Sequence, residues 1–250
     1  MKKKFSLSGL PDFSTLSVQN REYVSSIIKT QFIAFGFSPI STSLIEKRSN
    51  LFGSYGEDGE KLIFQILRSG DYLQKVEKAL DNLTSKTLSP LISDKSLRYD
   101  LTVPLTRYIS ENRSSITFPF RRYEIGSVFR ADRPQKGRLR QFTQCDADII
   151  GSQSLWLEID LLNLLGTIFN QLKLDGLVIR VSHRKVLEGI FKSFSSDLSF
   201  SKFCIIIDKL DKVGLDKVGV PAEVFLAMQI GDQSQINHPI FQIDLTHLHQ

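Results

Sequence analysis

The chain has 250 residues, of which 41% are hydrophobic and 24% charged, and its formal net charge at pH 7 is +5. This length suffices for one large domain or two small ones, and the hydrophobic share excludes a disordered chain. The only cysteines, Cys145 and Cys204, exclude a disulfide framework and a cysteine-rich zinc site. No run of about 18 apolar residues occurs, so no membrane-spanning helix is expected. The N-terminal stretch 1–9 contains lysines but no apolar segment follows it, as a signal peptide would require. We therefore expect a cytoplasmic protein without membrane contact.

The first half of the chain mixes helical and extended patterns. Apolar residues at helical spacing predict a helix over residues 17–35, which Gly36 ends. The other elements predicted here are an extended segment at 37–46, a strand at 61–67, helix and loop at 71–95, a strand at 97–102, and a helix from Pro104 to about Glu111.

The second half is built around a predicted hairpin. Residues 121–130 read as a strand, Pro134 and Gly137 mark a loop, and a second strand follows, so the two strands pair antiparallel. Later elements are a helix at 154–173, a strand at 177–181, a helix at 184–194, and an apolar run at 203–207 that fits a strand or a buried helix. An antiparallel sheet flanked by helices is an α+β pattern.

The loop of this hairpin is strongly basic. Its cations are Arg130, Arg133, Lys136, Arg138 and Arg140. Clustered cations suit the phosphates of a nucleotide or a nucleic acid backbone, although a solvated charged loop is the simpler alternative.

The strand after the loop carries polar residues at every second position, which places them on one face. They are Arg140, Phe142, Gln144, Asp146 and Asp148. Burying such groups unpaired costs about 1–3 kcal/mol each on mutational scales, so this is a poor core face. It more naturally lines a pocket for a charged ligand, and the alternative is a solvated edge strand.

Four segments, in chain order, resemble the histidyl-tRNA synthetase family of class II aminoacyl-tRNA synthetases. Residues 130–144 resemble motif 2 of that class, and residues 97–104 resemble the family's histidine-binding segment. Residues 51–62 and 207–214 also match the family's usual course. The resemblance spans residues 5–218 and implies a class II fold, in which helices flank an antiparallel sheet.

The resemblance implies a two-step ligase reaction in the cytoplasm. The carboxylate of histidine attacks the α-phosphorus of ATP, giving histidyl-adenylate and pyrophosphate, and the histidyl group then passes to tRNA(His). It further implies magnesium accompanying the ATP phosphates and a homodimer when the protein is complete. The cysteines and histidines form no metal-ligand pattern, so we expect no metal held by protein side chains.

The same resemblance assigns roles to individual residues. Arg130 is the catalytic residue, bridging the histidine carboxylate and the α-phosphate. The residues implied for histidine are Asp100, Thr102, Arg130, Gln144 and Asp148. Those implied for ATP are Arg130, Asp132 near the adenine amino group, Arg138 on the γ-phosphate and Phe142 stacked on adenine. Arg133 and Gln135 are implied to lie toward the 5′ end of the tRNA.

Each assignment has a structural alternative. Arg130 could pair with Asp132 or Asp148, and the predicted adenine-stacking ring could belong to the core. Asp100 could cap the helix that follows it, a common use of aspartate. Asp146 has no assigned role and could be the partner of a loop arginine.

Several features depart from the family pattern. Ser43 stands where motif 1 usually has a proline, Leu139 replaces an aromatic residue, and the N-terminal signature is weakened at residues 8–12. Motif 3, the later histidine-specific segments and the anticodon-binding domain do not occur in this sequence. We therefore expect a partial catalytic core over residues 1–218, incomplete at its C-terminal side, and the start of an inserted helical region over residues 219–250.

Two other functions fit parts of the sequence. A synthetase-like paralogue serves as the histidine-sensing regulatory subunit of ATP phosphoribosyltransferase, and the chain could also be a non-catalytic remnant. The paralogue has no need of a loop that faces tRNA. The polar loop residues Arg133, Gln135, Lys136 and Arg138 therefore favour the synthetase.

Overall fold

The structure is a computed structural model, and it describes residues 6–74, 76, 84–181, 183–192, 198–213 and 241–244. The chain forms two compact units, Met1–Lys173 and Leu174–Gln250. The domain boundary predicted after residue 218 lies outside the described residues. No helix of the described part is both long and apolar enough to cross a membrane.

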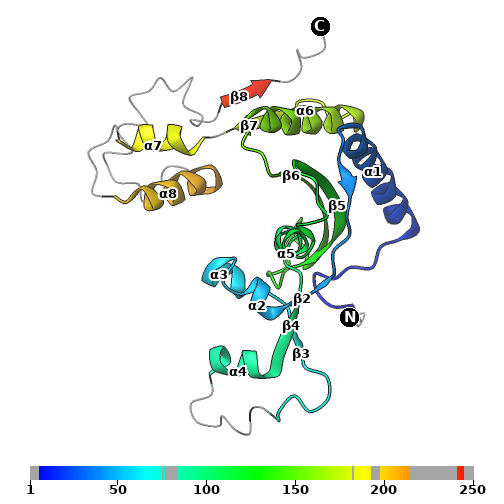
Figure 1. The fold of residues 1–250 in the computed structure, drawn as a ribbon, viewed down its shortest axis with the longest axis vertical. Helices are drawn as coiled ribbons and strands as arrows, with labels where there is room; N and C mark the ends of the chain where they lie inside the picture. The colour runs from blue at the N-terminus through cyan, green and yellow to red at the C-terminus, as the bar shows by residue number, and fades with distance from the viewer. Residues whose placement is uncertain are drawn as a thin grey trace. The chain divides into compact units, whose positions relative to one another are not determined.

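The main sheet of the first unit confirms the predicted hairpin. Strand β5 (Phe120–Phe129) pairs antiparallel with β6 (Gln141–Ile150), with Phe120 opposite Ile150 and Phe129 opposite Gln141. The short strand β1 (Ser38–Pro39) adds to the other edge of β5 in parallel. Figure 1 shows the long, twisted hairpin formed by β5 and β6.

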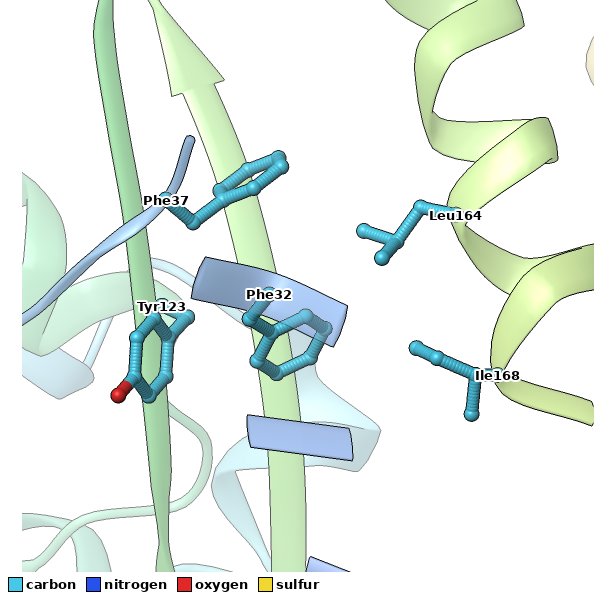
Figure 2. Packing of buried hydrophobic residues seen from close by; sticks show 5 residues of the cluster. All are labelled: Phe32, Phe37, Tyr123, Leu164 and Ile168. Carbon is cyan, nitrogen blue, oxygen red and sulfur yellow. The ribbon is translucent and has the colours of Figure 1, made fainter. Parts of the chain in front are cut away.

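One face of this sheet is covered by two helices and forms the core. Helix α1 (Thr15–Ala34) begins at Ser14, whose side chain accepts a hydrogen bond from Ser17 N, and helix α6 (Trp156–Gln171) contacts α1. Figure 2 shows the buried cluster in which apolar side chains of both helices meet the sheet. Its members are Phe32, Phe37, Tyr123, Leu164 and Ile168. The predicted helices at 17–35 and 154–173 are thus confirmed.

The opposite face of the hairpin lies beside helix α5 (Thr102–Asn112), as Figure 1 shows. A smaller antiparallel sheet has the strand order β2 (Ile45–Lys47), β4 (Ser93–Leu97), β3 (Gln65–Leu67). The described parts of its connections carry the short helices α2 (Arg48–Leu51), α3 (Gly56–Glu60) and α4 (Ser85–Ile92).

The second unit contains a two-stranded antiparallel sheet and two helices. Strand β7 (Val178–Val181) pairs with β8 (Phe241–Asp244), and α7 (Arg184–Lys192) contacts α8 (Phe200–Val213). The ring of Phe203 lies between the two helices, with its centroid 5.3 Å from that of Phe191. The ambiguous run at 203–207 is therefore part of a helix.

Two predicted strands differ from the structure. The strand predicted at 97–102 is wrong except at Leu97, because β4 occupies Ser93–Leu97, partly in the stretch predicted as helix and loop. Beyond Leu97 the Asp100 carboxylate accepts hydrogen bonds from the first N–H groups of α5, where the chain enters that helix. The strand predicted at 61–67 begins only at Gln65, because residues 61–63 close a turn in which Leu62 N donates to Gly59 O.

Candidate active site

The polar face predicted from the alternation along β6 is present, and it extends onto β5. Directly opposite residues of an antiparallel pair share a face. The pairs on this face are Arg122 with Asp148, Glu124 with Asp146, Gly126 with Gln144, and Val128 with Phe142. The residues between them, including Cys145, Ala147 and Ile149, pack against the apolar core. The hairpin therefore separates a hydrophobic face from a charged one.

Arg130, which follows β5, is held without a carboxylate partner. Its Nε donates to Tyr99 O at 3.2 Å. Its guanidinium lies 4.4 Å from the ring centroid of Tyr99 and 5.1 Å from that of Phe142. Within the described residues it forms no ion pair, since Asp132 pairs with Arg138 and Asp148 with another arginine. The positive charge of Arg130 is therefore available to an anionic ligand.

Asp100 caps the start of α5, as the structural alternative anticipated, from the position before the N-cap residue Leu101. Its Oδ1 accepts from Thr102 N at 3.0 Å and from Val103 N at 3.2 Å. The same oxygen accepts from the hydroxyl of Tyr55 at 2.7 Å. Thr102 is the first residue of α5 and is exposed. Both predicted residues thus lie at the N-terminus of α5, and capping does not prevent a ligand role for the carboxylate.

Tyr55 was not singled out by the sequence. It lies in the 51–62 segment, whose only signal was its match to the family. Burial, followed by the hydrogen bond to Asp100, raises the pKa of Tyr55 well above its ordinary value. The phenol therefore remains protonated and acts only as a donor to Asp100.

Asp148 is joined to a fully buried arginine. Arg122 has an exposed fraction of 0%, and its Nη2 lies 2.5 Å from Asp148 Oδ2. Asp148 Oδ2 has no hydrogen-bond partner in the described structure. The contact is therefore an ion pair whose geometry does not meet that of a hydrogen bond. Burial raises the pKa of Asp148, while Arg122 opposes that shift.

Further buried polar atoms on this face lack partners. Arg122 Nε and Nη1 and Gln144 Oε1 form no hydrogen bond within the described part of the chain. Burial and the neighbouring Asp148 charge raise the pKa of Asp146. Native proteins pair nearly all buried polar groups, so such a concentration is typical of a site that a ligand completes. Asp146 forms no ion pair with a loop arginine among the described residues, where the loop residue Arg138 pairs with Asp132 instead.

A buried ion pair supports the middle of the polar face. Arg98 Nη1 and Glu124 Oε1 lie 2.7 Å apart, and each side chain has an exposed fraction of only 3%. Glu124 also accepts from Thr42 N and Oγ1, and Arg98 Nε donates to Ser127 O. A side chain at Gly126 would collide with the Arg98 guanidinium, which explains the glycine there. No sequence pattern singles out Arg98 beyond its place in the 97–104 segment.

The basic loop is folded back on itself. Arg138 pairs with Asp132 at 3.3 Å and has a side chain exposed fraction of 58%, while Arg133 and Gln135 are exposed. Arg140, the first residue of the predicted polar alternation, is tied to the loop, because its Nε donates to Asp132 O at 3.0 Å. The loop thus presents its predicted tRNA residues to solvent.

The structure describes no group of three or more His, Cys, Asp or Glu side chains arranged to hold a metal ion. On the described residues, the site consists of one free arginine, two aromatic rings and several carboxylates around a buried amide. Such a set can bind a ligand that carries both anionic and cationic groups.

An antiparallel hairpin with helices on one face and charged residues on the other is the core of a class II synthetase-like fold. Solved structures share this fold. Histidyl-tRNA synthetase from Nostoc sp. PCC 7120 matches with a TM-score of 0.66 and 26% identity, over 91% of this chain and 48% of that one. A Bacillus halodurans structure, described as an ATP phosphoribosyltransferase regulatory subunit/histidyl-tRNA synthetase, matches in fold alone, with a TM-score of 0.60 and 14% identity, over 86% of this chain and 51% of that one.

Sequence comparisons identify the family. The family model described as Histidyl-tRNA synthetase matches residues 9–228. Histidine--tRNA ligase of Christiangramia forsetii is 48% identical over 84% of this chain and 46% of that protein, and the Cytophaga hutchinsonii ligase is 43% identical over 87% and 48%. The chain belongs to the histidyl-tRNA synthetase family, and it spans about half the length of these curated relatives.

Proposed function

We propose that this chain supplies one wall of a site that activates histidine with ATP and transfers it to tRNA(His). The observation that carries the proposal is Arg130, held over two aromatic rings beside the Asp100 cap and free of any described carboxylate partner. In a member of this family, such an arginine is placed to serve a reaction between two anions.

The first step must bring the histidine carboxylate to the α-phosphate of ATP. Positioning and preorganised cations can lower such a barrier, because negative charge accumulates at the reacting centre. The planar guanidinium of Arg130 can donate to both groups at once, which the single ammonium of a lysine does less well. Its Nε bond to Tyr99 O and the ring beneath it restrict its orientation before substrate arrives.

The polar face of β6 is the proposed histidine subsite. Gln144 and Asp148 offer a buried amide and a carboxylate to the imidazole and ammonium groups, together with Asp100 and Thr102 at the start of α5. Hydrogen bonds to charged groups are roughly twice as strong as neutral ones, which suits a cationic ligand. Burial raises the pKa of Asp148 and the charge of Arg122 opposes that rise, which favours the carboxylate form as an acceptor.

The ATP subsite is proposed at the loop side of Arg130. Phe142 offers a ring face for adenine, Asp132 an acceptor for its amino group, and Arg138 a cation for the γ-phosphate. Arg138 must leave Asp132 to do so, and an exposed ion pair of this kind is worth only about 0–1 kcal/mol. Magnesium is proposed to enter with the phosphates as the ATP complex.

The tRNA and assembly assignments extend the proposal. Exposed Arg133 and Gln135 are proposed to face the 5′ end of the tRNA. A homodimer of the complete protein is proposed, and its support is the exposed apolar residues of α1, among them Leu16 and Ile33. Because charging of tRNA serves translation, the activity is assigned to the cytoplasm.

The test is histidine-dependent ATP–pyrophosphate exchange by the protein translated from its whole reading frame. We expect exchange with histidine and not with the other amino acids, followed by charging of tRNA(His). Absence of exchange in that protein, with control of a phosphoribosyltransferase by histidine instead, would replace this function by the regulatory one.

A further inference from the structure

We propose that Tyr55 is a positioning residue for the amino-acid substrate, whose hydroxyl fixes Asp100 so that one carboxylate oxygen addresses the α-ammonium group. The inference rests on the proposed function, because it names how that site orients histidine. Tyr55 itself touches Asp100 and not the reacting atoms, so it acts through the carboxylate.

The two oxygens of Asp100 are used unequally. Oδ1 accepts three hydrogen bonds, from the Tyr55 hydroxyl at 2.7 Å, Thr102 N at 3.0 Å and Val103 N at 3.2 Å. A carboxylate oxygen offers about two lone-pair sites, so Oδ1 has no capacity left for a ligand. The described residues give no hydrogen bond to Oδ2. The carboxylate is therefore held by one oxygen and open at the other.

The position of Asp100 in the chain indicates which ligand group it meets. The carbonyl oxygen of the preceding residue, Tyr99, accepts a hydrogen bond from Arg130 Nε, so the proposed catalytic arginine lies against the backbone next to Asp100. The carboxylate and ammonium groups of an amino acid are attached to the same carbon. When Arg130 binds the carboxylate of histidine, the ammonium group is the cation nearest Asp100.

Tyr55 supports both sides of this arrangement. Its ring lies against that of Tyr99, with centroids 4.5 Å apart, and the guanidinium of Arg130 lies 4.4 Å from the centroid of the same Tyr99 ring. Tyr55 therefore contacts the Asp100 carboxylate through its hydroxyl and the Tyr99 ring through its own ring.

The segment around Tyr55 is built to hold it in place. Leu51 is fully buried, and Gly53 N donates to Glu60 Oε1 at 2.6 Å, which closes the segment on itself. A methyl group on Gly59 would lie 2.6 Å from Tyr55 Cβ, a distance that real side chains do not adopt. At the far end, Leu62 O accepts from Ala131 N, next to Arg130. The segment thus connects the Asp100 end of the site to the Arg130 end.

The test compares Tyr55→Phe with the unaltered protein, both translated from the whole reading frame, in ATP–pyrophosphate exchange. The variant keeps the ring contact with Tyr99 and loses only the hydroxyl. We expect the KM for histidine to rise roughly tenfold or more, as for loss of a hydrogen bond to a charged group, while the KM for ATP changes less than about twofold. Tyr72→Phe, which alters an exposed tyrosine, is the matched control and is expected to change neither.

Two inhibitors identify the ligand group that Tyr55 serves. Histidinol keeps the ammonium group and lacks the carboxylate, whereas imidazolepropionate keeps the carboxylate and lacks the ammonium. Tyr55→Phe is expected to weaken inhibition by histidinol roughly tenfold and to leave imidazolepropionate nearly unchanged. Gly59→Ala, which displaces Tyr55 without altering it, is expected to show the same selectivity and provides a second route should Tyr55→Phe fold poorly.

The outcomes separate this inference from the proposed function. If the unaltered protein shows no histidine-dependent exchange, the proposed function is wrong. If it does, and the variants bind histidinol normally, Tyr55 has no positioning role. Equal rises in both KM values together with a lower Tm would assign Tyr55 a purely structural role and would also overturn the inference.

Discussion

The two faces of strand β6 have opposite chemistry. Cys145, Ala147 and Ile149 pack against the core formed with α1 and α6, while the residues between them form a charged wall. Burial raises the pKa of Asp146 and of Asp148, so the charged forms are disfavoured where they lie. The charged face therefore lowers the stability of the fold, whereas the apolar face raises it. A charged surface retained in spite of such a cost is typical of a binding site.

The largest effect is expected where the charged wall is supported from beneath. Arg98→Met leaves Glu124 buried without its cation, and breaking a buried pair in this way costs about 3–5 kcal/mol. Urea denaturation followed by circular dichroism measures the change. Arg68→Met is the control, because its pair with Asp94 is partly exposed and is worth only about 0–1 kcal/mol. Equal losses of unfolding free energy in the two variants would show that burial of the Arg98–Glu124 pair does not determine its contribution to stability.

A comparable effect on catalysis, without loss of the fold, is expected at Arg130. Arg130→Lys keeps the charge and removes the planar fork and the Nε bond to Tyr99 O. Losing one preorganised stabilising group costs about 2.7–4 kcal/mol, or about 10²–10³ in kcat. The measurement is the kcat of ATP–pyrophosphate exchange, with exposed Arg113→Lys as control. A variant that keeps full kcat would remove Arg130 from the reaction.

A smaller effect is expected from making the apolar face resemble the polar one. Ala147→Asp places a carboxylate against the core, where an unpaired polar group costs about 1–3 kcal/mol on mutational scales. Asp146→Ala, one position away, is the control and is expected not to destabilise the protein. The two variants are compared by Tm at neutral pH, and similar Tm values would contradict the separation of the faces.

The smallest effect, and the only one with a favourable sign, is expected from neutralising Asp146. Its pKa in the folded protein lies above its ordinary value of 3.8, so between those two values the folded state holds a proton that the unfolded state has released. The free energy of unfolding therefore falls as pH rises through that window, and the penalty is present above it.

Asp146→Asn is accordingly expected to raise the free energy of unfolding at pH 7, with a gain that shrinks as the pH falls through the same window. Urea titrations at several pH values measure it. Asp94→Asn, which breaks a partly exposed ion pair, is expected to have the opposite sign and a magnitude of at most about 1 kcal/mol. A gain for Asp146→Asn that is independent of pH would point to packing and not to charge.

Local patterns predicted much of this protein because they depend on periodicity. The alternation along residues 142–148 requires only the geometry of a strand, so it identified the polar face before any fold was known. The apolar faces of α1 and α6 follow from helical spacing in the same way. The strand predicted at 97–102 was wrong because the cap made by Asp100 depends on side-chain contacts that periodicity does not encode.

The contacts that finish the site join residues far apart in the chain. Tyr55 reaches Asp100, Arg98 reaches Glu124, and no spacing rule links either pair. The sequence by itself determined the family, the hairpin and the face that carries the charged groups, because these depend on short motifs and on the two-residue repeat of a strand. Only the tertiary structure decided which charges are paired, which are free and which tyrosine holds the carboxylate, because burial and distance arise when separate segments pack together.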